Sequence, residues 1–185
     1  MGDVGSHDFC KEIMEDFIRT FGKIDVLINN AGGALQIPGG PKGEFKDMPM
    51  EYWDSQMNLN LNSAAYLSRY AVEDMIAKGT EGRIVNISSV HGQVTWVHRR
   101  MLPYSAAKAG LNMFTKALGV EVAKYGIRVN CVAPGFIYTK LSERYTPSDL
   151  VAFSHKIPVG RGGQVEEIVP MIQFLADVEK TRFIV

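Results

Sequence analysis

Residues 82–90 read GRIVNISSV, and residues 103–126 read PYSAAKAGLNMFTKALGVEVAKYG. The first stretch is a short apolar run of the kind that forms a buried strand, and it ends in Ser88 and Ser89. The second stretch has the apolar spacing of an amphipathic helix, with Tyr104 and Lys108 four residues apart near its start. Side chains at positions i and i+4 lie on one face of a helix. The sequence therefore predicts a proton-transferring site built from a strand-end serine and a helical tyrosine and lysine.

Helical and strand-like segments alternate on both sides of this stretch. The expected strands are short and almost entirely apolar, which is typical of strands covered on both faces. Such an alternation predicts a parallel sheet with right-handed crossovers. We therefore expect one α/β domain over residues 1–185, with a Rossmann-like, doubly wound parallel sheet. The expected helices cover roughly residues 7–21, 50–77, 104–124, 147–155 and 165–176, and the expected strands residues 24–28, 83–87 and 127–132.

The composition is that of a globular protein without a strong overall charge. Twenty basic and twenty acidic residues cancel, so neither nucleic acid nor an anionic membrane is expected as a partner. No apolar run approaches the roughly 20 residues of a membrane span, and the N-terminus lacks the pattern of a secretory signal. Cys10 and Cys131 lie far apart, so we expect two reduced thiols and a cytoplasmic location. The histidines show no metal-ligand spacing, and no metal site is expected.

Small and polar residues follow each of the three expected strands. The segments are Asn29-Asn30-Ala31-Gly32, Ser88-Ser89 and Pro134-Gly135. Ligands of open parallel α/β sheets bind beyond the carboxyl ends of the strands, and small residues let a ligand approach the backbone closely. Packing alone is the competing explanation for these residues. Because all three strand ends share the feature, we favour a ligand site.

Tyr104 and Lys108 suit acid–base chemistry. A phenol has a pKa of about 10, whereas a neighbouring ammonium group stabilises the phenolate and lowers that pKa. A general acid or base works best when its pKa lies near the working pH. Ser89 could hydrogen-bond a substrate hydroxyl or carbonyl and hold it against the Tyr104 oxygen. The spacing Y-x-x-x-K is common by chance in helices, so its context has to support this interpretation.

Further segments extend the pattern beyond the site itself. They are IDVLINNAG at residues 24–32, Trp53 with Asn60-Leu61, GRIVNISS at 82–89, YSAAKAG at 104–110, GIRVN at 126–130 with Pro134-Gly135, and Ile157-Pro158 through Arg161 to Glu166-Glu167-Ile168. In this order, and over nearly the whole chain, they resemble the classical short-chain dehydrogenase/reductase family. The resemblance implies a reversible hydride transfer between NAD or NADP and a small-molecule alcohol or carbonyl substrate.

The resemblance also implies roles for the matching residues. Tyr104 would be the acid–base residue, Lys108 would lower its pKa and hold the nicotinamide ribose, and Ser89 would orient the substrate oxygen. Asn60 would hold a water in a proton relay from Lys108. The residues expected to contact the cofactor are Asp3 and Val4 beside the adenine, Asn30, Ala31 and Gly32 along it, Tyr104 and Lys108, Pro134, Gly135 and Ile137 flanking the nicotinamide, and Thr139 on its carboxamide.

The sequence departs from the family pattern at both ends. The family's glycine-rich phosphate loop follows its first strand, whereas this sequence begins at the Asp3-Val4 pair. The residue that separates NAD from NADP and the final strand are also missing, so we expect a truncated, incomplete domain. The strand at residues 24–28 would become an exposed apolar edge, which invites pairing with another chain. The alternative function is a catalytically impaired fragment that acts only through association with itself or a full-length relative.

The surroundings of the site allow further, weaker expectations. Arg99 and Arg100 would recognise an anionic substrate or form a solvated loop, and the second interpretation is favoured. His91 would line the substrate cavity or be a plain loop residue, and again the second is favoured. Met101 and Leu102 indicate an apolar wall beside the site.

Quaternary structure and substrate are less constrained. In the family, helices such as those at residues 50–77 and 104–124 pair into a four-helix contact, so we expect a homo-oligomer, a dimer or tetramer, through them. The substrate itself cannot be read from the loops, and sugars, polyols, steroids and acyl thioesters all stay open.

Overall fold

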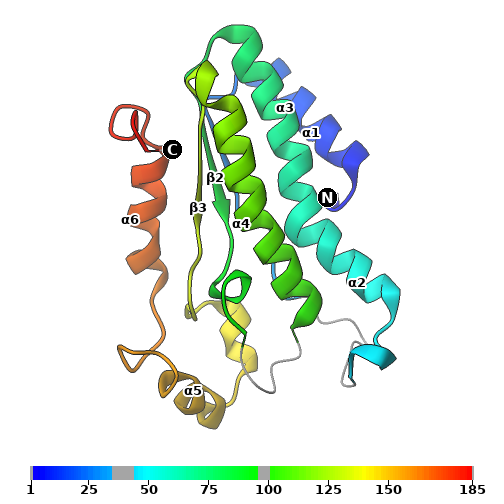
Figure 1. Cartoon of the computed structure of the whole chain (residues 1–185), viewed down its shortest axis with the longest axis vertical. Helices are drawn as coiled ribbons and strands as arrows, with labels where there is room; N and C mark the ends of the chain where they lie inside the picture. The colour runs from blue at the N-terminus through cyan, green and yellow to red at the C-terminus, as the bar shows by residue number, and fades with distance from the viewer. Residues whose placement is uncertain (1, 35–43, 96–100, 185) are drawn as a thin grey trace.

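The computed structural model describes residues 2–34, 44–95 and 101–184 of the chain. These residues form a parallel sheet between two layers of helices (Figure 1). The helices are α1 His7–Phe21, α2 Met50–Met57, α3 Ser63–Lys78, α4 Leu102–Val122, α5 Pro147–Ser154 and α6 Val165–Ala176. The strands are β1 Val26–Asn29, β2 Arg83–Ile87 and β3 Arg128–Val132. Short helical turns lie at Phe45–Asp47, Asn58–Asn62, Val90–Gly92, Ala123–Tyr125 and Lys140–Arg144.

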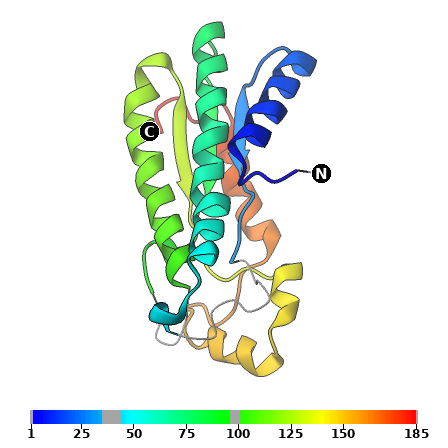
Figure 2. The ribbon, with the colours of Figure 1, turned by 90° about the vertical axis from the view of Figure 1, so that its right-hand side faces the viewer.

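The sheet has the order β1-β2-β3, and both pairings are parallel. Figure 1 shows α1, α3 and α4 on one side of the sheet and α6 on the other. Because the three strands are parallel, their carboxyl ends lie at one edge of the sheet. The segment that contains α5 lies beyond that edge (Figure 2). The predicted α/β class with a Rossmann-like parallel sheet is confirmed.

One expected helix is interrupted. The sequence predicted a single helix over residues 50–77, but a π-helical turn at Asn58–Asn62 separates α2 from α3. Within this turn the buried Asn60 side chain donates from Nδ2 to the carbonyl oxygens of Gln56 (3.0 Å) and Gly33 (3.1 Å). Its Oδ1 accepts from the backbone N–H of Gly33 at 2.8 Å. The widened turn thus joins the helix to the loop after β1, a tertiary contact that helical periodicity does not reveal.

The main hydrophobic core lies between the sheet and the layer of α1, α3 and α4. Its buried members are Met14, Ile24, Ala71, Met75, Ile84, Val122, Ile127 and Val129. Gly82 precedes β2 at this core, and a Cβ there would overlap the side chain of Met75, which would have to move. None of the described helices combines the length and the apolar character that crossing a membrane requires.

Within the described residues, β1 is an edge strand, because it pairs only with β2. Val26 and Ile28 on this strand are 38% and 45% exposed. The helix on the far side of the sheet, α6, packs on β2 and β3. The expected exposed apolar edge at residues 24–28 is therefore confirmed, although the strand is shifted slightly toward Asn29.

A chain of buried polar side chains crosses the centre of the molecule. The Asn86 side chain accepts through Oδ1 from Asn29 Nδ2 at 2.8 Å and donates through Nδ2 to Thr115 Oγ1 at 2.9 Å. Asn29 Nδ2 also donates to Ser68 Oγ at 3.1 Å, and the Thr115 hydroxyl donates to the Leu111 carbonyl at 2.7 Å. Buried polar groups stabilise a fold only when they are paired in this way. The chain of bonds joins β1, β2, α3 and α4.

Arg83 fastens the opposite, amino-terminal end of the central strand. Its side chain is only 1% exposed, and the guanidinium donates to Thr181 Oγ1 (2.9 Å) and to the carbonyl oxygens of Val178 (2.8 Å) and Gly82 (2.8 Å). Burial lowers the pKa of this guanidinium from its ordinary value. Arg83 therefore ties the segment after α6 to the start of β2.

Replacing the central amide is expected to be costly. Asn86→Ala should lower the free energy of unfolding by about 2 kcal/mol, because it removes two buried hydrogen bonds, one to Asn29 and one to Thr115. Asn130→Ala on β3 is the matched control, since the Asn130 side chain makes one long bond of 3.4 Å to the Ile184 carbonyl. Urea unfolding of both variants measures the difference, and equal losses would contradict the central role of Asn86.

Candidate functional site

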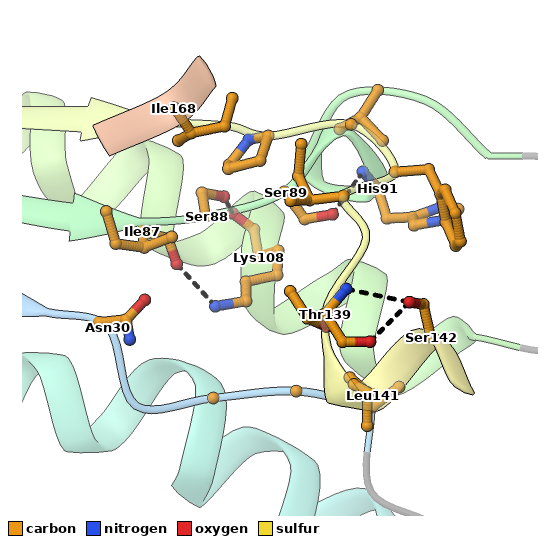
Figure 3. Close-up of a pocket in the computed structure, with 18 of the residues that line it drawn as sticks. Asn30, Ile87, Ser88, Ser89, His91, Lys108, Thr139, Leu141, Ser142 and Ile168 are labelled. Carbon is orange, nitrogen blue, oxygen red and sulfur yellow. Dashed lines mark hydrogen bonds between the residues drawn. The ribbon is translucent and has the colours of Figure 1, made fainter. Parts of the chain in front are cut away.

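A cavity of about 590 Å³ opens at the carboxyl ends of the three strands. Its walls come from the loop after β1, the turn after β2, the first turns of α4, the segment after β3, and α6. Figure 3 shows that side chains from several of these segments converge on the same space. The cavity lies where parallel α/β sheets bind their ligands.

Ser89 and Tyr104 meet in this cavity from two different elements. Ser89 follows β2 and caps the turn Val90–Gly92, and its Oγ accepts from the His91 backbone N–H at 3.2 Å. Tyr104 lies in the first turn of α4, where Pro103 is tolerated because its position needs no N–H donor. Both side chains line the cavity, and the Ser89 side chain is close enough to influence the pKa of the Tyr104 phenol. The predicted pair is therefore brought together.

Burial raises the pKa of the Tyr104 phenol, and the influence of the Ser89 side chain opposes part of that rise. The net direction is opposite to the lowering that the sequence predicted from Lys108. In the protein without ligand, the loss of solvent around the phenolate raises the pKa of Tyr104 by more than Ser89 lowers it. Tyr104 is consequently protonated at neutral pH.

Lys108 lies one helical turn after Tyr104 and is only 4% exposed. Its Nζ donates to the Ile87 carbonyl at 2.8 Å and lies 5.8 Å from the centroid of the Tyr104 ring. The Ser88 hydroxyl donates to the Lys108 carbonyl at 3.1 Å, so the end of β2 and this turn of α4 are joined twice (Figure 3). Burial lowers the pKa of Lys108 to about 8. The amine therefore stays mostly charged at neutral pH but titrates close to it.

The loop after β1 contributes backbone rather than side chains. Gly32 faces Lys108 and Asn60, and a Cβ at this position would come within 2.9 Å of Asn60 Oδ1 and 3.2 Å of Lys108 Nζ. The Asn60 side chain holds the neighbouring Gly33 through both its amide atoms. The backbone of the loop after β1 therefore passes close to the Lys108 amine.

The segment after β3 forms the opposite wall. Ile137 makes a parallel bridge with Gly163, which anchors this wall to the approach to α6. The Thr139 N–H donates to Ser142 Oγ at 2.9 Å, and the Ser142 hydroxyl donates back to the Thr139 carbonyl at 2.6 Å (Figure 3). These reciprocal bonds hold the start of the helical turn Lys140–Arg144 beside the cavity.

Most of the residues that the sequence predicted for the site line this cavity, and four do not. The predicted residues in its wall are Ser89, Tyr104, Lys108, Asn30, Gly32, Pro134, Gly135, Ile137 and Thr139. Asn60 and Ala31 lie outside the lining, and Asn60 reaches the site only through Gly33. Asp3 and Val4 are also outside it. Asp3 Oδ1 accepts a hydrogen bond from the Gly5 backbone N–H, and the Val4 carbonyl accepts one from the Cys10 thiol.

Other lining residues were missed or given less weight by the sequence. His91 lines the cavity with its ring 6.3 Å from that of Tyr104, although the plain loop interpretation was favoured. Phe136 and Tyr145 belong to an aromatic cluster at its mouth. Met101 lines the cavity as expected, whereas Leu102 is exposed. The hypothesis on Arg99 and Arg100 lies outside the described residues.

Comparison with known proteins agrees with this architecture. The family described as Enoyl-(Acyl carrier protein) reductase matches residues 1–184. An uncharacterized oxidoreductase of Schizosaccharomyces pombe is 40% identical over 185 residues, which cover 98% of this chain and 68% of that protein. A 3-oxoacyl-(acyl-carrier-protein) reductase of Thermotoga maritima is 37% identical over 182 residues, with 97% and 69% covered.

A solved structure gives the same result in three dimensions. The gluconate 5-dehydrogenase of Burkholderia cenocepacia, determined with NADP and tartrate, superimposes with a TM-score of 0.86 at 30% identity. The alignment covers 99% of this chain and 69% of that one. The chain belongs to the short-chain dehydrogenase/reductase family, whose members are NAD(P)-dependent oxidoreductases.

The lysine offers a test of its burial. The folded-state pKa of about 8 lies below the ordinary value of 10.5, so the folded protein binds fewer protons than the unfolded chain between these pH values. Relative to Lys108→Met, the stability of the unaltered protein should therefore rise with pH from about 8 to about 10.5, by up to about 3 kcal/mol. Denaturant unfolding of both proteins across this range measures the difference. A difference that does not change with pH would contradict burial as the cause.

Proposed function

We propose that the protein interconverts a carbonyl compound and an alcohol with NAD or NADP, through Ser89, Tyr104 and Lys108. The observation that carries this proposal is the meeting of Ser89, Tyr104 and Lys108 in the lining of one cavity, with Lys108 Nζ 5.8 Å from the centroid of the Tyr104 ring. Polar groups that converge in a largely apolar cavity, with shifted pKa values, are typical of a catalytic site.

The residues around the cavity fit the nicotinamide half of the cofactor. The bare backbone at Gly32, the Pro134-Gly135 turn, Ile137 and Thr139 would hold it, because small residues leave room for a flat ring close to the main chain. The nicotinamide, when bound, supplies or accepts the hydride. The protein's own part is to place and polarise the substrate.

In the reducing direction, Ser89 and Tyr104 would both hydrogen-bond the carbonyl oxygen. The phenol of Tyr104 then gives its proton to that oxygen as the carbonyl becomes an alcohol. The phenol of Tyr104 carries its proton at neutral pH, as this step requires. Ser89 keeps its proton and only orients the oxygen.

Lys108 would have two tasks in this scheme. Its charged amine stabilises the phenolate that remains on Tyr104 after proton transfer. It would also hold the nicotinamide ribose, because a charged amine has three donors and its bond to the Ile87 carbonyl uses one of them. Asn60 would hold a water in a proton relay from Lys108, and the closeness of both side chains to Gly32 supports this role.

We further propose 3-oxoacyl thioesters as the first substrates to test. A relative that is 37% identical is named as a 3-oxoacyl-(acyl-carrier-protein) reductase, and the matching family carries an acyl-carrier name. The largely apolar wall around Ser89 and Tyr104, with Met101 and Phe136, is compatible with an acyl chain.

Turnover tests this proposal directly. The protein should oxidise NADPH or NADH in the presence of a short 3-oxoacyl thioester, followed by the absorbance of the reduced nicotinamide. Tyr104→Phe should lower kcat at least about a hundredfold, because it removes the proton donor without changing the shape of the cavity. Lys116→Ala, on the exposed side of α4, is the control and should retain activity. Retained turnover in Tyr104→Phe would overturn the assignment.

Association with a second chain is the alternative function, and the surface supports it. Val26 and Ile28 form an apolar edge on β1, and Met113 and Val120 on α4 are 64% and 78% exposed. We propose that the face made by α3 and α4 pairs with its copy, so that a dimer or a tetramer forms whether or not the chain is active. Exposed apolar side chains on one helix face favour such a contact.

The oligomer can be tested apart from catalysis. Met113→Lys together with Val120→Lys should convert the oligomer to a monomer on a sizing column, because two charges would be buried in the contact. Val26→Lys at the β1 edge serves as the comparison for pairing through the sheet. A monodisperse monomer before any substitution would contradict the contact, and cofactor binding by that monomer would exclude the association-only function.

A further inference from the structure

Asn112 lies one helical turn beyond Lys108 on α4, and its side chain bonds to two other segments of the site. Its Nδ2 donates to the Gly92 carbonyl at 3.2 Å. Its Oδ1 accepts from the Cys131 thiol on β3 at 3.4 Å. One amide therefore spans the turn after β2, the catalytic helix and the third strand.

The turn that Asn112 contacts is the one that carries Ser89. Gly92 closes this turn, because its N–H donates to the Ser89 carbonyl at 2.9 Å. The turn is pressed against α4: a Cβ on Gly92 would come 2.7 Å from the carbonyl carbon and 2.8 Å from the carbonyl oxygen of Lys108. On its other side, the Val90 N–H donates to the Pro134 carbonyl at 2.9 Å. The position of Ser89 thus depends on how this turn is seated on the helix.

We propose that Asn112 is a positioning residue, whose amide seats the Ser89 turn on α4 and so holds the Ser89 hydroxyl against Tyr104. The proposal rests on the function proposed above for Ser89 and Tyr104. Asn112 itself is separated from the cavity and does not line it. It acts on the reaction only through the turn that it holds.

The chemistry of the contact explains why an amide is needed. The Gly92 carbonyl requires a donor and the Cys131 thiol an acceptor, and an asparagine side chain supplies both. An aspartate would keep the acceptor but place a carboxylate against the Gly92 carbonyl. A leucine of similar size would supply neither bond.

The kinetic test is a double-mutant cycle. With saturating cofactor, Asn112→Leu should lower kcat about tenfold to a hundredfold, because small displacements of a catalytic group have effects of that size. The KM for the cofactor should stay unchanged. In the Ser89→Ala background the same substitution should cost less than about twofold, because the hydroxyl that it positions is already gone. Fully additive losses would overturn the proposal and indicate a general effect on the fold.

Two further variants separate positioning from stability. Asn112→Asp keeps the volume and the acceptor for Cys131, so it should fold even if Asn112→Leu does not, and it should lose activity through the Gly92 contact alone. Asn130→Leu makes the same change of side chain on β3, where, among the described residues, the asparagine side chain bonds only to the Ile184 carbonyl, and it should retain kcat. An Asn112→Asp variant with unchanged kcat would overturn the proposal.

A spectroscopic arm does not require turnover. In protein labelled with ¹³Cζ-tyrosine, the Tyr104 resonance is assigned by its loss in Tyr104→Phe. Ser89→Ala should shift this resonance, because the substitution removes a hydroxyl that lines the same cavity as the Tyr104 phenol and acts on its pKa. Asn112→Leu should shift it in the same direction, and should add no further shift in the Ser89→Ala background. If the protein shows these shifts without turnover, the proposed reaction fails and the positioning role stands; an unshifted Tyr104 resonance in Asn112→Leu refutes the role itself.

Discussion

The side-chain amide of Asn86, at the centre of the middle strand, is the contact on which the rest of the structure depends. It accepts from Asn29 on β1 and donates to Thr115 on α4, and its own side chain is fully buried. The first bond fixes β1 beside β2, in the register that pairs Asn29 with Asn86. The second bond fixes α4 over the sheet. Since Ser89 follows β2 and Tyr104 lies on α4, one amide sets the frame in which the two can meet.

Burial shapes the chemistry of the site as strongly as the contacts do. It raises the pKa of Tyr104 and lowers the pKa of Lys108, so both groups are moved toward their neutral forms. For the tyrosine this favours a proton donor at neutral pH. For the lysine it leaves an amine that is mostly charged at neutral pH and loses its proton when the pH rises only slightly above neutral. A charged group on a ligand near Lys108 would change the pKa of the amine again, in a direction set by the sign of that charge.

Much of the fold could be predicted because local pattern and burial agree. The strand Arg83–Ile87 and the helix Val165–Ala176 have the predicted bounds, since apolar runs and helix-ending residues mark them clearly. The interruption at Asn58–Asn62 could not be predicted, because the apolar spacing continues through it and its cause is the contact between Asn60 and Gly33. The position of His91 in the cavity wall was not favoured by the sequence either, because a loop residue has no periodicity that shows which way it faces.

The sequence by itself determined the class of the fold, the order of its elements and the three residues, Ser89, Tyr104 and Lys108, that we propose as catalytic and that share a cavity, because spacing within one helix and strand-end composition are local properties. Only the tertiary structure decided which of the predicted cofactor residues share a cavity, why Asp3 and Val4 lie apart from it, and how Asn112 reaches both Gly92 and Cys131. Those facts depend on contacts between segments far apart in the chain. Their distances are set by packing of the helices on the sheet, which no local pattern encodes.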